Sequence, residues 1–415
     1  MALTLSGTNG VVGAGFSITP GGAVAGVVTV VTGPVTVGAA VTISESGIEA
    51  SGIGITCASI NDGQISGRRN IVINGAMIVK QRADLTMTST STYSLDRWRA
   101  AVGSSFNWSS ATVTQSTTSP DGFGKSLKVD IASTNTPTGS QNALIQTKIE
   151  GQDLQQLAYG TSSAKQCTLS FYVRSNKTGT YCVQVANTAN TKYVLFEYTI
   201  NSADTWERKS VTFSGNTANT LNNDNALGFD VNFHLATGSD DHVSATSTWT
   251  TYSGGSFRAT SNQVNLFDNA SNEWYLTGCQ LEVGSQATTF EHRSFGEELS
   301  LCQRYLCRLQ PGASYVNYGV GGIYSSTQAV VQVNYPVSLR AAPTFSYNGA
   351  LNTFYDIVGG FSSFSAMTKT QDMGSSATGY QFANIQIVGS GTAGNTMMLA
   401  TLNNTNTYMD FDSEL

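Results

Sequence analysis

Asp240, Asp241 and His242 form the cluster that comes closest to a catalytic or metal-binding group in this sequence. Two carboxylates beside an imidazole could hold a metal ion or move protons in a hydrolysis reaction. They stand in a long polar stretch, residues 236–255, where a solvated loop explains them without any chemistry. We therefore interpret the cluster as part of a solvated loop.

Glu291, His292 and Arg293 form a second group, at the point where a strand pattern gives way to a helix pattern. For His292 we expect a structural hydrogen bond. The sequence contains no G-x-S-x-G, H-E-x-x-H or P-loop motif. A glycosidase needs two carboxylates about 5–10 Å apart, and nothing in the sequence indicates such a pair. We expect no catalytic residue, no cofactor and no metal site.

Trp249, Tyr252 and Phe257 are the candidate ligand-binding residues. Aromatic faces stack on sugar rings, and neighbouring amide and hydroxyl groups can bond sugar hydroxyls. The alternative is a loop that packs on its own domain. Trp206 stands at the start of a predicted strand, and for it we expect a packing role.

The charge content limits the possible partners. Only 12% of the residues are charged, and the formal net charge is −6. Nucleic-acid binding needs clustered Lys and Arg, which the sequence lacks, so we expect no nucleic-acid partner. The apolar run at residues 23–43 is interrupted by Gly, Thr and Pro34, so we expect no membrane insertion.

Alternating apolar and polar residues predict the strands that must hold any binding residues. The clearest stretches are residues 168–174, 180–185, 193–200, 208–213 and 227–235. Short strands separated by polar turns predict an all-β protein, an antiparallel jelly-roll β-sandwich.

A helix is expected only after the sandwich. Ser294 and Glu297 have capping-box spacing, and Leu299, Cys302, Leu306 and Leu309 follow at helical spacing.

The changes of pattern divide the chain. Residues 1–67 are rich in Gly and Val, and we interpret them as a β-rich assembly segment for virion attachment or trimerisation; a flexible leader is the alternative. Residues 70–295 are the sandwich and residues 296–309 the short helix. Residues 310–415, with very little charge, are a small C-terminal β-domain.

The six cysteines include no C-x-x-C pair, so a zinc site is not indicated. Cys167 and Cys182 are expected on the two strands of one hairpin, with residues 175–179 as its loop. In that register their side chains lie on opposite faces. We expect six free, mostly buried thiols.

Three stretches carry a resemblance to a known class of proteins. Residues 70–82 have an N-x-x-I-N-G start and a Gln-Arg pair, and residues 93–98 end in Asp-Arg-Trp. The strand-to-helix junction at residues 274–308 and the stretch at residues 339–345 complete the set. Together they resemble tail-fibre and related virion proteins of tailed bacteriophages, of the podovirus-like kind with marine or cyanobacterial hosts. Residues 168–181 and 206–213 are also similar to jelly-roll carbohydrate-binding modules.

The resemblance implies a trimeric tail fibre that docks on other virion proteins by its N-terminal segment and binds a host-surface glycan or other receptor by its outer β-domains. No Lys or Arg precedes Arg68, so a secretory signal is not expected, and synthesis in the host cytoplasm fits. Two alternatives stay open. One is a capsid decoration or head fibre with the same module, and the other is a polysaccharide-degrading tailspike.

Overall fold

The computed structural model describes residues 35–36, 41–44, 47–50 and 68–415, apart from residues 105, 109–110, 188, 190, 253–256, 311, 314, 376–378 and 402–405. The chain divides into two compact units, residues 1–58 and residues 59–415. The first holds a three-stranded antiparallel sheet of β1 (Val35–Thr36), β2 (Val41–Ser44) and β3 (Gly47–Ala50). Most of the assembly segment predicted at residues 1–67 lies outside the described residues, so its role stays a prediction.

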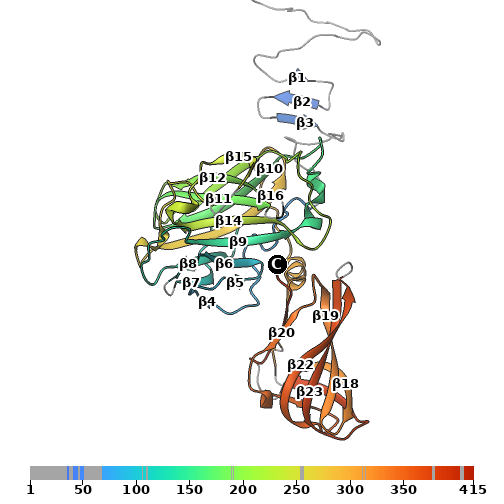
Figure 1. Ribbon diagram of the computed structural model, residues 1–415. Coiled ribbons are helices and arrows are strands. Elements are labelled where there is room, and N and C mark those ends of the chain that lie inside the picture. Colours follow the sequence, from blue (N-terminus) through green and yellow to red (C-terminus); the bar gives the residue numbers. More distant parts are fainter. Residues whose placement is uncertain are drawn as a thin grey trace, which may run out of the picture. The chain divides into compact units, whose positions relative to one another are not determined.

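The larger unit contains a sandwich of two antiparallel sheets (Figure 1). One sheet has six strands, in the spatial order β13 (Glu207–Phe213), β10 (Cys167–Ser175), β16 (Glu273–Val283), β8 (Ser126–Asp130), β7 (Thr112–Ser116) and β4 (Leu85–Thr86). The other has seven, in the order β15 (Thr246–Thr251), β12 (Lys192–Ile200), β11 (Gly179–Asn187), β14 (Leu227–Thr237), β9 (Asn142–Glu150), β6 (Trp98–Gly103) and β5 (Thr92–Leu95). The predicted all-β jelly-roll sandwich is confirmed.

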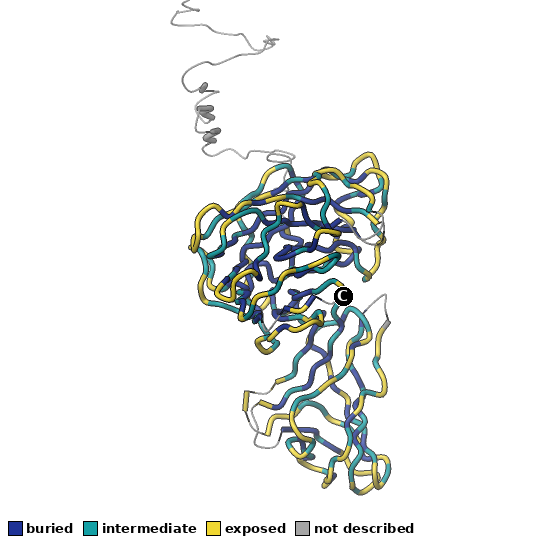
Figure 2. The backbone as a smooth tube through the Cα atoms, turned by 60° about the vertical axis from the view of Figure 1, so that its left-hand side comes forward, coloured by how far each residue is buried: buried dark blue, intermediate teal, exposed yellow. Residues whose placement is uncertain are grey.

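A core rich in aromatic side chains fills the space between the two sheets. Figure 2 draws the buried residues in dark blue, and they are frequent along the strands of the sandwich. Strand β14 illustrates the alternation, because Phe229, Val231 and Phe233 all belong to this core. The ring of Phe233 meets that of Phe171 on β10 edge-to-face, with 4.9 Å between the centroids. Burial of such large rings dominates the stability of a core.

The hairpin expected around Cys167 and Cys182 is wrong. Strand β10 pairs with β13 and β16, whereas β11 pairs with β12 and β14, so the two cysteines lie in different sheets. The apolar faces of both strands point into the shared core from opposite sides, and the short loop between them therefore crosses from one sheet to the other. The five described cysteines are free and buried, while Cys57 lies outside the described residues.

The helix predicted at residues 296–309 is shorter than expected. Helix α1 covers Phe295–Gln303, and residues Leu306–Leu309 form strand β17 instead. Ser294 caps the helix as predicted, since its hydroxyl accepts a hydrogen bond from the Glu297 amide at 3.3 Å. A stretch of four residues is too short for its spacing to distinguish a strand from a helix. Residues Leu306–Leu309 form a strand because they pair with residues Met409–Asp412 near the end of the chain.

Two further antiparallel sheets form the C-terminal part. The three-stranded one has the order β17, β25 (Met409–Asp412) and β20 (Thr344–Tyr347). The six-stranded one, which we call the C-terminal sheet, has the order β21 (Phe354–Asp356), β24 (Thr396–Thr401), β18 (Asn317–Ser325), β19 (Gln328–Leu339), β23 (Gly379–Ser390) and β22 (Ser362–Ser375). A second apolar core, distinct from that of the sandwich, lies along one face of this sheet.

The motifs behind the phage-protein resemblance build contacts inside this fold. The Asn70 amide donates to the Cys279 carbonyl at 3.1 Å, and its oxygen accepts from the amides of Val72 and Leu281. The Asn74 amide donates to the carbonyls of Val79 and Asp96, both at 2.9 Å. The Asn70 contacts tie the start of the sandwich to β16, its last strand in the sequence.

The described residues also include four short 3-10 helices: η1 (Gly151–Leu157), η3 (Ser239–Asp241), η4 (Leu266–Asp268) and η5 (Leu351–Thr353). Within the described ranges, no helix combines the length and the apolar character needed to cross a membrane.

Candidate binding surface

The cluster of Asp240, Asp241 and His242 has a structural use. Asp241 is buried, and its carboxylate accepts a hydrogen bond from Asn142 at 2.9 Å and pairs with Arg258 at 3.2 Å. Burial raises the pKa of Asp241. The described part of the chain contains no group of three or more His, Cys, Asp or Glu arranged to hold a metal ion. The cluster ties the loop after β14 to the neighbouring strand β9.

Glu291 and Arg293, on either side of His292, are structural too. The Glu291 carboxylate accepts from the amides of Arg69 and Asn70, and Arg293 donates to the Asn70 carbonyl. His292 packs its ring against Phe123 and Phe290, with centroids 5.1 and 4.9 Å away. The structural hydrogen bonds that the sequence assigned to His292 are thus made by Glu291 and Arg293.

The predicted ligand-binding aromatics lie in two places. Trp249, on β15, donates from its indole to the Ser214 carbonyl at 2.9 Å and packs on the sandwich core. Tyr252 and Phe257 stack on each other, with centroids 4.1 Å apart, in a small cluster on the other side of the seven-stranded sheet. This placement matches the alternative of a loop that packs on its own domain. The binding role of the three stays a prediction.

Trp206 is half-buried, and its ring meets Tyr275 edge-to-face at 6.1 Å. It therefore packs against the outer face of the six-stranded sheet, as expected.

The outer face of the C-terminal sheet is the surface with the most unusual composition. Inward residues such as Val331 and Ile385 form the second core, so the alternate positions face outward. On β18, β19, β23 and β22 the outward residues are Val320, Gly322, Tyr324, Gln328, Val330, Gln332, Asn334, Phe382, Asn384, Gln386, Val388, Ala366, Thr368, Gln371 and Met373. None of them is charged. We call this set the uncharged face.

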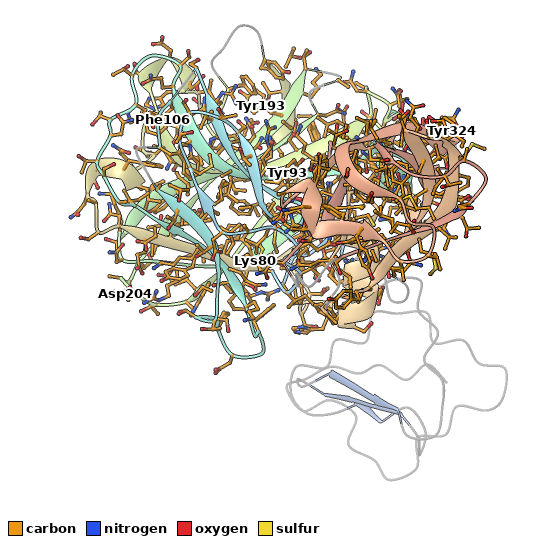
Figure 3. All side chains as sticks on the ribbon, turned by 90° about the horizontal axis from the view of Figure 1, so that it is seen from below. Lys80, Tyr93, Phe106, Tyr193, Asp204 and Tyr324 are labelled. Carbon is orange, nitrogen blue, oxygen red and sulfur yellow. The ribbon has the colours of Figure 1, made fainter. Side chains whose placement is uncertain are left out.

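Rows of paired residues cross the uncharged face from strand to strand. One row runs from Val320 through Gln332 and Asn384 to Gln371. The Asn384 amide donates to Gln371 at 3.2 Å, which leaves further donors and acceptors of both amides for other partners. Tyr324, which Figure 3 places on the exterior of the C-terminal part, is 52% exposed. The face thus offers amides beside apolar and aromatic surface.

The few charges of residues 310–415 all lie away from this face. Lys369 and Asp372 pair with each other, and their register places them on the inner side of the sheet. The Asp356 carboxylate accepts from the amides of Val358, Met398 and Phe361. The four others, Arg340, Asp410, Asp412 and Glu414, bond residues of the sandwich, of β17 or of the chain end. The fold leaves the uncharged face free of them.

Exposed apolar side chains gather in the same part of the chain. Eight large hydrophobic residues are strongly exposed among those described, and seven of them belong to residues 310–415: Tyr315, Val316, Val320, Tyr324, Ile357, Val358 and Met373. Surfaces of this kind mark sites of interaction. An absence of charge, with many amide donors and acceptors, suits a neutral partner rich in hydroxyl groups.

Sequence reasoning singled out the aromatic loop and missed this face. The available signal was the scarcity of charge in residues 310–415 combined with two-residue alternation, for example Gln328, Val330, Gln332 and Asn334 against Ala329, Val331 and Val333.

No protein-family model matches the chain, and no curated protein matches it. Among solved structures, a candidate sugar-binding protein from Bacteroides thetaiotaomicron is 13% identical with a TM-score of 0.31, and the match covers 52% of this chain and 100% of that one. The enzymatically active domain of tailspike protein 4 from bacteriophage CBA120 is 12% identical with a TM-score of 0.27, over 52% of this chain and 21% of that one. The module TmCBM61, solved with β-1,4-galactotriose, is 9% identical with a TM-score of 0.27, over 52% and 99%. Likeness at this level carries no functional assignment.

Proposed function

We propose that this protein is an adhesion protein that binds neutral glycan chains on the uncharged face of its C-terminal sheet. The observation that carries the proposal is the sorting of charges, since all seven charged residues of 310–415 lie elsewhere while amides and apolar groups remain on the face. Amides can both donate to and accept from sugar hydroxyls, and apolar side chains can meet the C–H faces of sugar rings.

Single contacts of this kind are weak, about 1 kcal/mol for a typical net hydrogen bond. Useful affinity then requires several copies acting together. A homotrimer would raise the avidity by roughly 10²–10⁴ through effective concentration. We propose a homotrimer on this ground, and size-exclusion chromatography with light scattering measures it directly. A monomer at micromolar concentration would contradict it.

We further propose a virion as the place of action, with the protein as a tail fibre that docks by residues 1–67 and meets the host by its outer β-domains. The support is the set of motifs at residues 70–82, 93–98 and 274–308. A capsid decoration protein is the second candidate on the same motifs. Microscopy of virions with this chain labelled separates a tail position from a capsid position.

The test of glycan binding compares two lysine substitutions at exposed strand positions. Gln332→Lys places a charge in the middle of the uncharged face, whereas Ser210→Lys places one on β13 of the sandwich. We expect the unmodified protein and Ser210→Lys to bind neutral host-surface polysaccharide equally, and Gln332→Lys to bind at least about tenfold more weakly because the charge must be desolvated.

Equal binding by both variants would overturn the assignment of this face. Release of soluble fragments from the polysaccharide would instead identify an enzyme of the tailspike type.

A further inference from the structure

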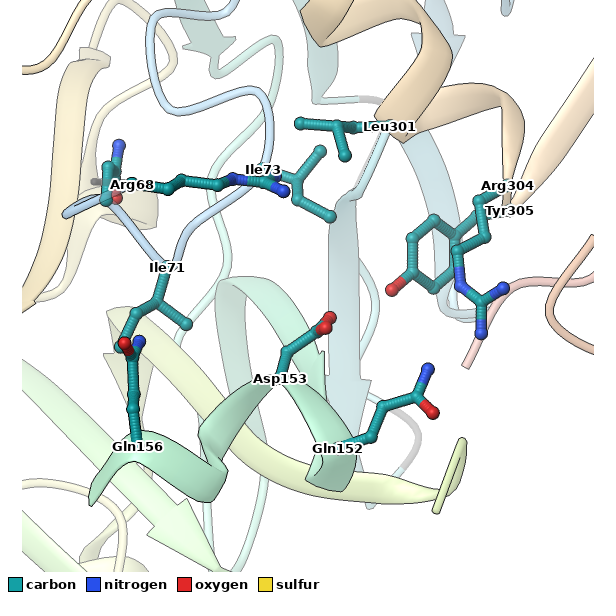
Figure 4. A pocket seen from close by; sticks show the side chains of 10 residues that line it. Arg68, Ile71, Ile73, Gln152, Asp153, Gln156, Leu301, Arg304 and Tyr305 are labelled. Atoms are coloured by element: carbon teal, nitrogen blue, oxygen red, sulfur yellow. The ribbon is translucent and has the colours of Figure 1, made fainter. Parts of the chain in front are cut away.

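A pocket of about 330 Å³ lies where the start of the sandwich meets η1 and the residues that follow α1 (Figure 4). Two guanidinium groups, one carboxylate and several amides line it, together with a patch of apolar side chains. None of its lining residues belongs to the uncharged face. A volume of this size is within the range of small-molecule sites.

Tyr305 is the first sign that the pocket is built for a ligand. Its side chain is fully buried, and its hydroxyl makes no hydrogen bond of ordinary geometry with any described residue, although the Glu150 carboxylate lies close enough to interact with it. The ring is held in place, because the Arg97 guanidinium lies over it at 3.4 Å from the centroid. Figure 4 shows the hydroxyl oxygen directed into the pocket. Buried hydroxyls normally have a partner, and an orphaned one requires an explanation.

Arg68 and Asp153 are the second sign. Neither side chain makes a hydrogen bond or an ion pair with a described residue, although both line the same pocket. Burial and the nearby Arg293 lower the pKa of Arg68, while partial burial and the nearby Glu150 raise the pKa of Asp153. The two opposite charges attract each other, but both side chains are exposed and make no direct polar contact with a described residue, so both are available to a ligand.

Arg304 shows the contrast. Its guanidinium binds both oxygens of the buried Glu150 carboxylate at 2.8 Å, and Gln152 donates to the same carboxylate. This pair is satisfied without a ligand. Because Glu150 neutralises Arg304, the remaining charges of the lining are those of Arg68 and Asp153, whose opposite signs favour a ligand without net charge.

We propose that this pocket binds a small neutral polyol, such as a single sugar ring. The hydroxyl groups of such a ligand can accept from Arg68, donate to Asp153 and pair with the Tyr305 hydroxyl. The side chains of Ile71, Ile73 and Leu301 supply apolar surface for the C–H groups of a ring. The site is separate from the polysaccharide surface proposed above and does not depend on it.

The experiment uses the full chain and a panel of neutral monosaccharides, with binding followed by saturation-transfer NMR and calorimetry. Tyr305→Phe removes only the orphaned oxygen, and Asp153→Asn keeps the shape of an exposed side chain. Asp121→Asn, at an exposed position outside the pocket, is the matched control. We expect at least one sugar to bind, both pocket variants to weaken it at least tenfold, and the control to leave it unchanged.

Three outcomes would overturn the proposal. One is that no monosaccharide binds, and another is that it binds equally to Asp153→Asn. The third is that inorganic phosphate binds instead, and that Arg68→Gln abolishes phosphate binding while Asp153→Asn leaves it unchanged. That pattern would identify an anion site. Because Asp153 is exposed, its variant tests the site even if Tyr305→Phe fails to fold. Gln332→Lys should bind the monosaccharide normally, which separates this site from the uncharged face.

Discussion

Arg97 and Glu414 form a buried ion pair that joins the end of the sequence to the sandwich. Their side chains are only 1% and 5% exposed, and Arg97 also donates to the Lys148 carbonyl. Arg82 adds a second cation, which contacts Glu414 at 3.2 Å and Asp412 at 3.0 Å. The hydroxyl of Tyr93 donates to the Leu415 carbonyl at 2.8 Å. Tyr93 is labelled in Figure 3. The last residues thus hold the C-terminal sheets against the sandwich.

Loss of the Glu414 carboxylate is expected to destabilise this contact strongly. Glu414→Gln leaves the buried Arg97 without a counter-charge, and breaking such a pair costs about 3–5 kcal/mol. Urea unfolding followed by circular dichroism measures the change in the free energy of unfolding. The control is Arg174→Gln, which breaks the 2.8 Å pair with Asp204, a partner that is 57% exposed, and should cost less than about 1 kcal/mol. Equal midpoints for Glu414→Gln and the unmodified chain would contradict the role given to this pair.

The strands of the sandwich could be predicted because alternation is a local property. Residues 227–235 alternate in the sequence, and β14 covers Leu227–Thr237 with the predicted apolar side in the core. The partner of a strand is not local. Val173 and Tyr181 are close in sequence and look like a hairpin, yet they belong to different sheets, because packing their apolar faces against each other buries more surface than pairing their edges.

The candidate site was harder to predict for a related reason. Trp249 and Phe257 are aromatic residues in a polar stretch, a pattern that suggests exposed side chains. Their burial depends on which sheet the loop covers, and that is not a local property of the sequence. The uncharged face consists of common residues such as Gln332 and Val330, and it becomes a surface only when four strands are placed in register. The pocket around Tyr305 unites residues more than 200 positions apart, which no spacing rule can reveal.

The stability of the protein is expected to depend on His234 in mildly acidic solution. This imidazole on β14 is fully buried, and neither ring nitrogen has a hydrogen-bond partner among the described residues. Burial, together with the nearby Arg258, lowers its pKa from 6.5 to about 3. The folded state therefore favours the neutral ring. Its contribution is fully present above pH 6.5 and is lost as the pH falls from about 6.5 towards 3, by up to about 4–5 kcal/mol.

Melting temperatures of the unmodified chain and of His234→Leu, recorded between pH 7.5 and pH 4, test this dependence. Leucine cannot take up a proton, so the variant should lose less stability on acidification than the unmodified chain. His292→Gln alters an exposed ring and should keep the original pH dependence. Parallel curves for His234→Leu and the unmodified chain would show that another group controls the acid sensitivity.

The buried cysteines should be inert in the native protein. Burial raises the pKa of Cys167 and of Cys307 to about 12, and it also raises the pKa of Cys182, Cys279 and Cys302. The thiolate is the reactive form, so at pH 8 a pKa near 12 reduces its population on the order of 10³-fold relative to a free cysteine, quite apart from steric access.

Cys57→Ala provides a suitable background for this measurement, since the five remaining thiols are the described ones. With a chromogenic disulfide reagent at pH 8, we expect almost no reaction within minutes in the native state and five thiols in guanidinium chloride. A count below five after unfolding without reductant would reveal a disulfide and contradict the free thiols seen here. Rapid native reaction of a single thiol would instead locate a region that opens readily, because a buried thiolate can form only when its surroundings admit water.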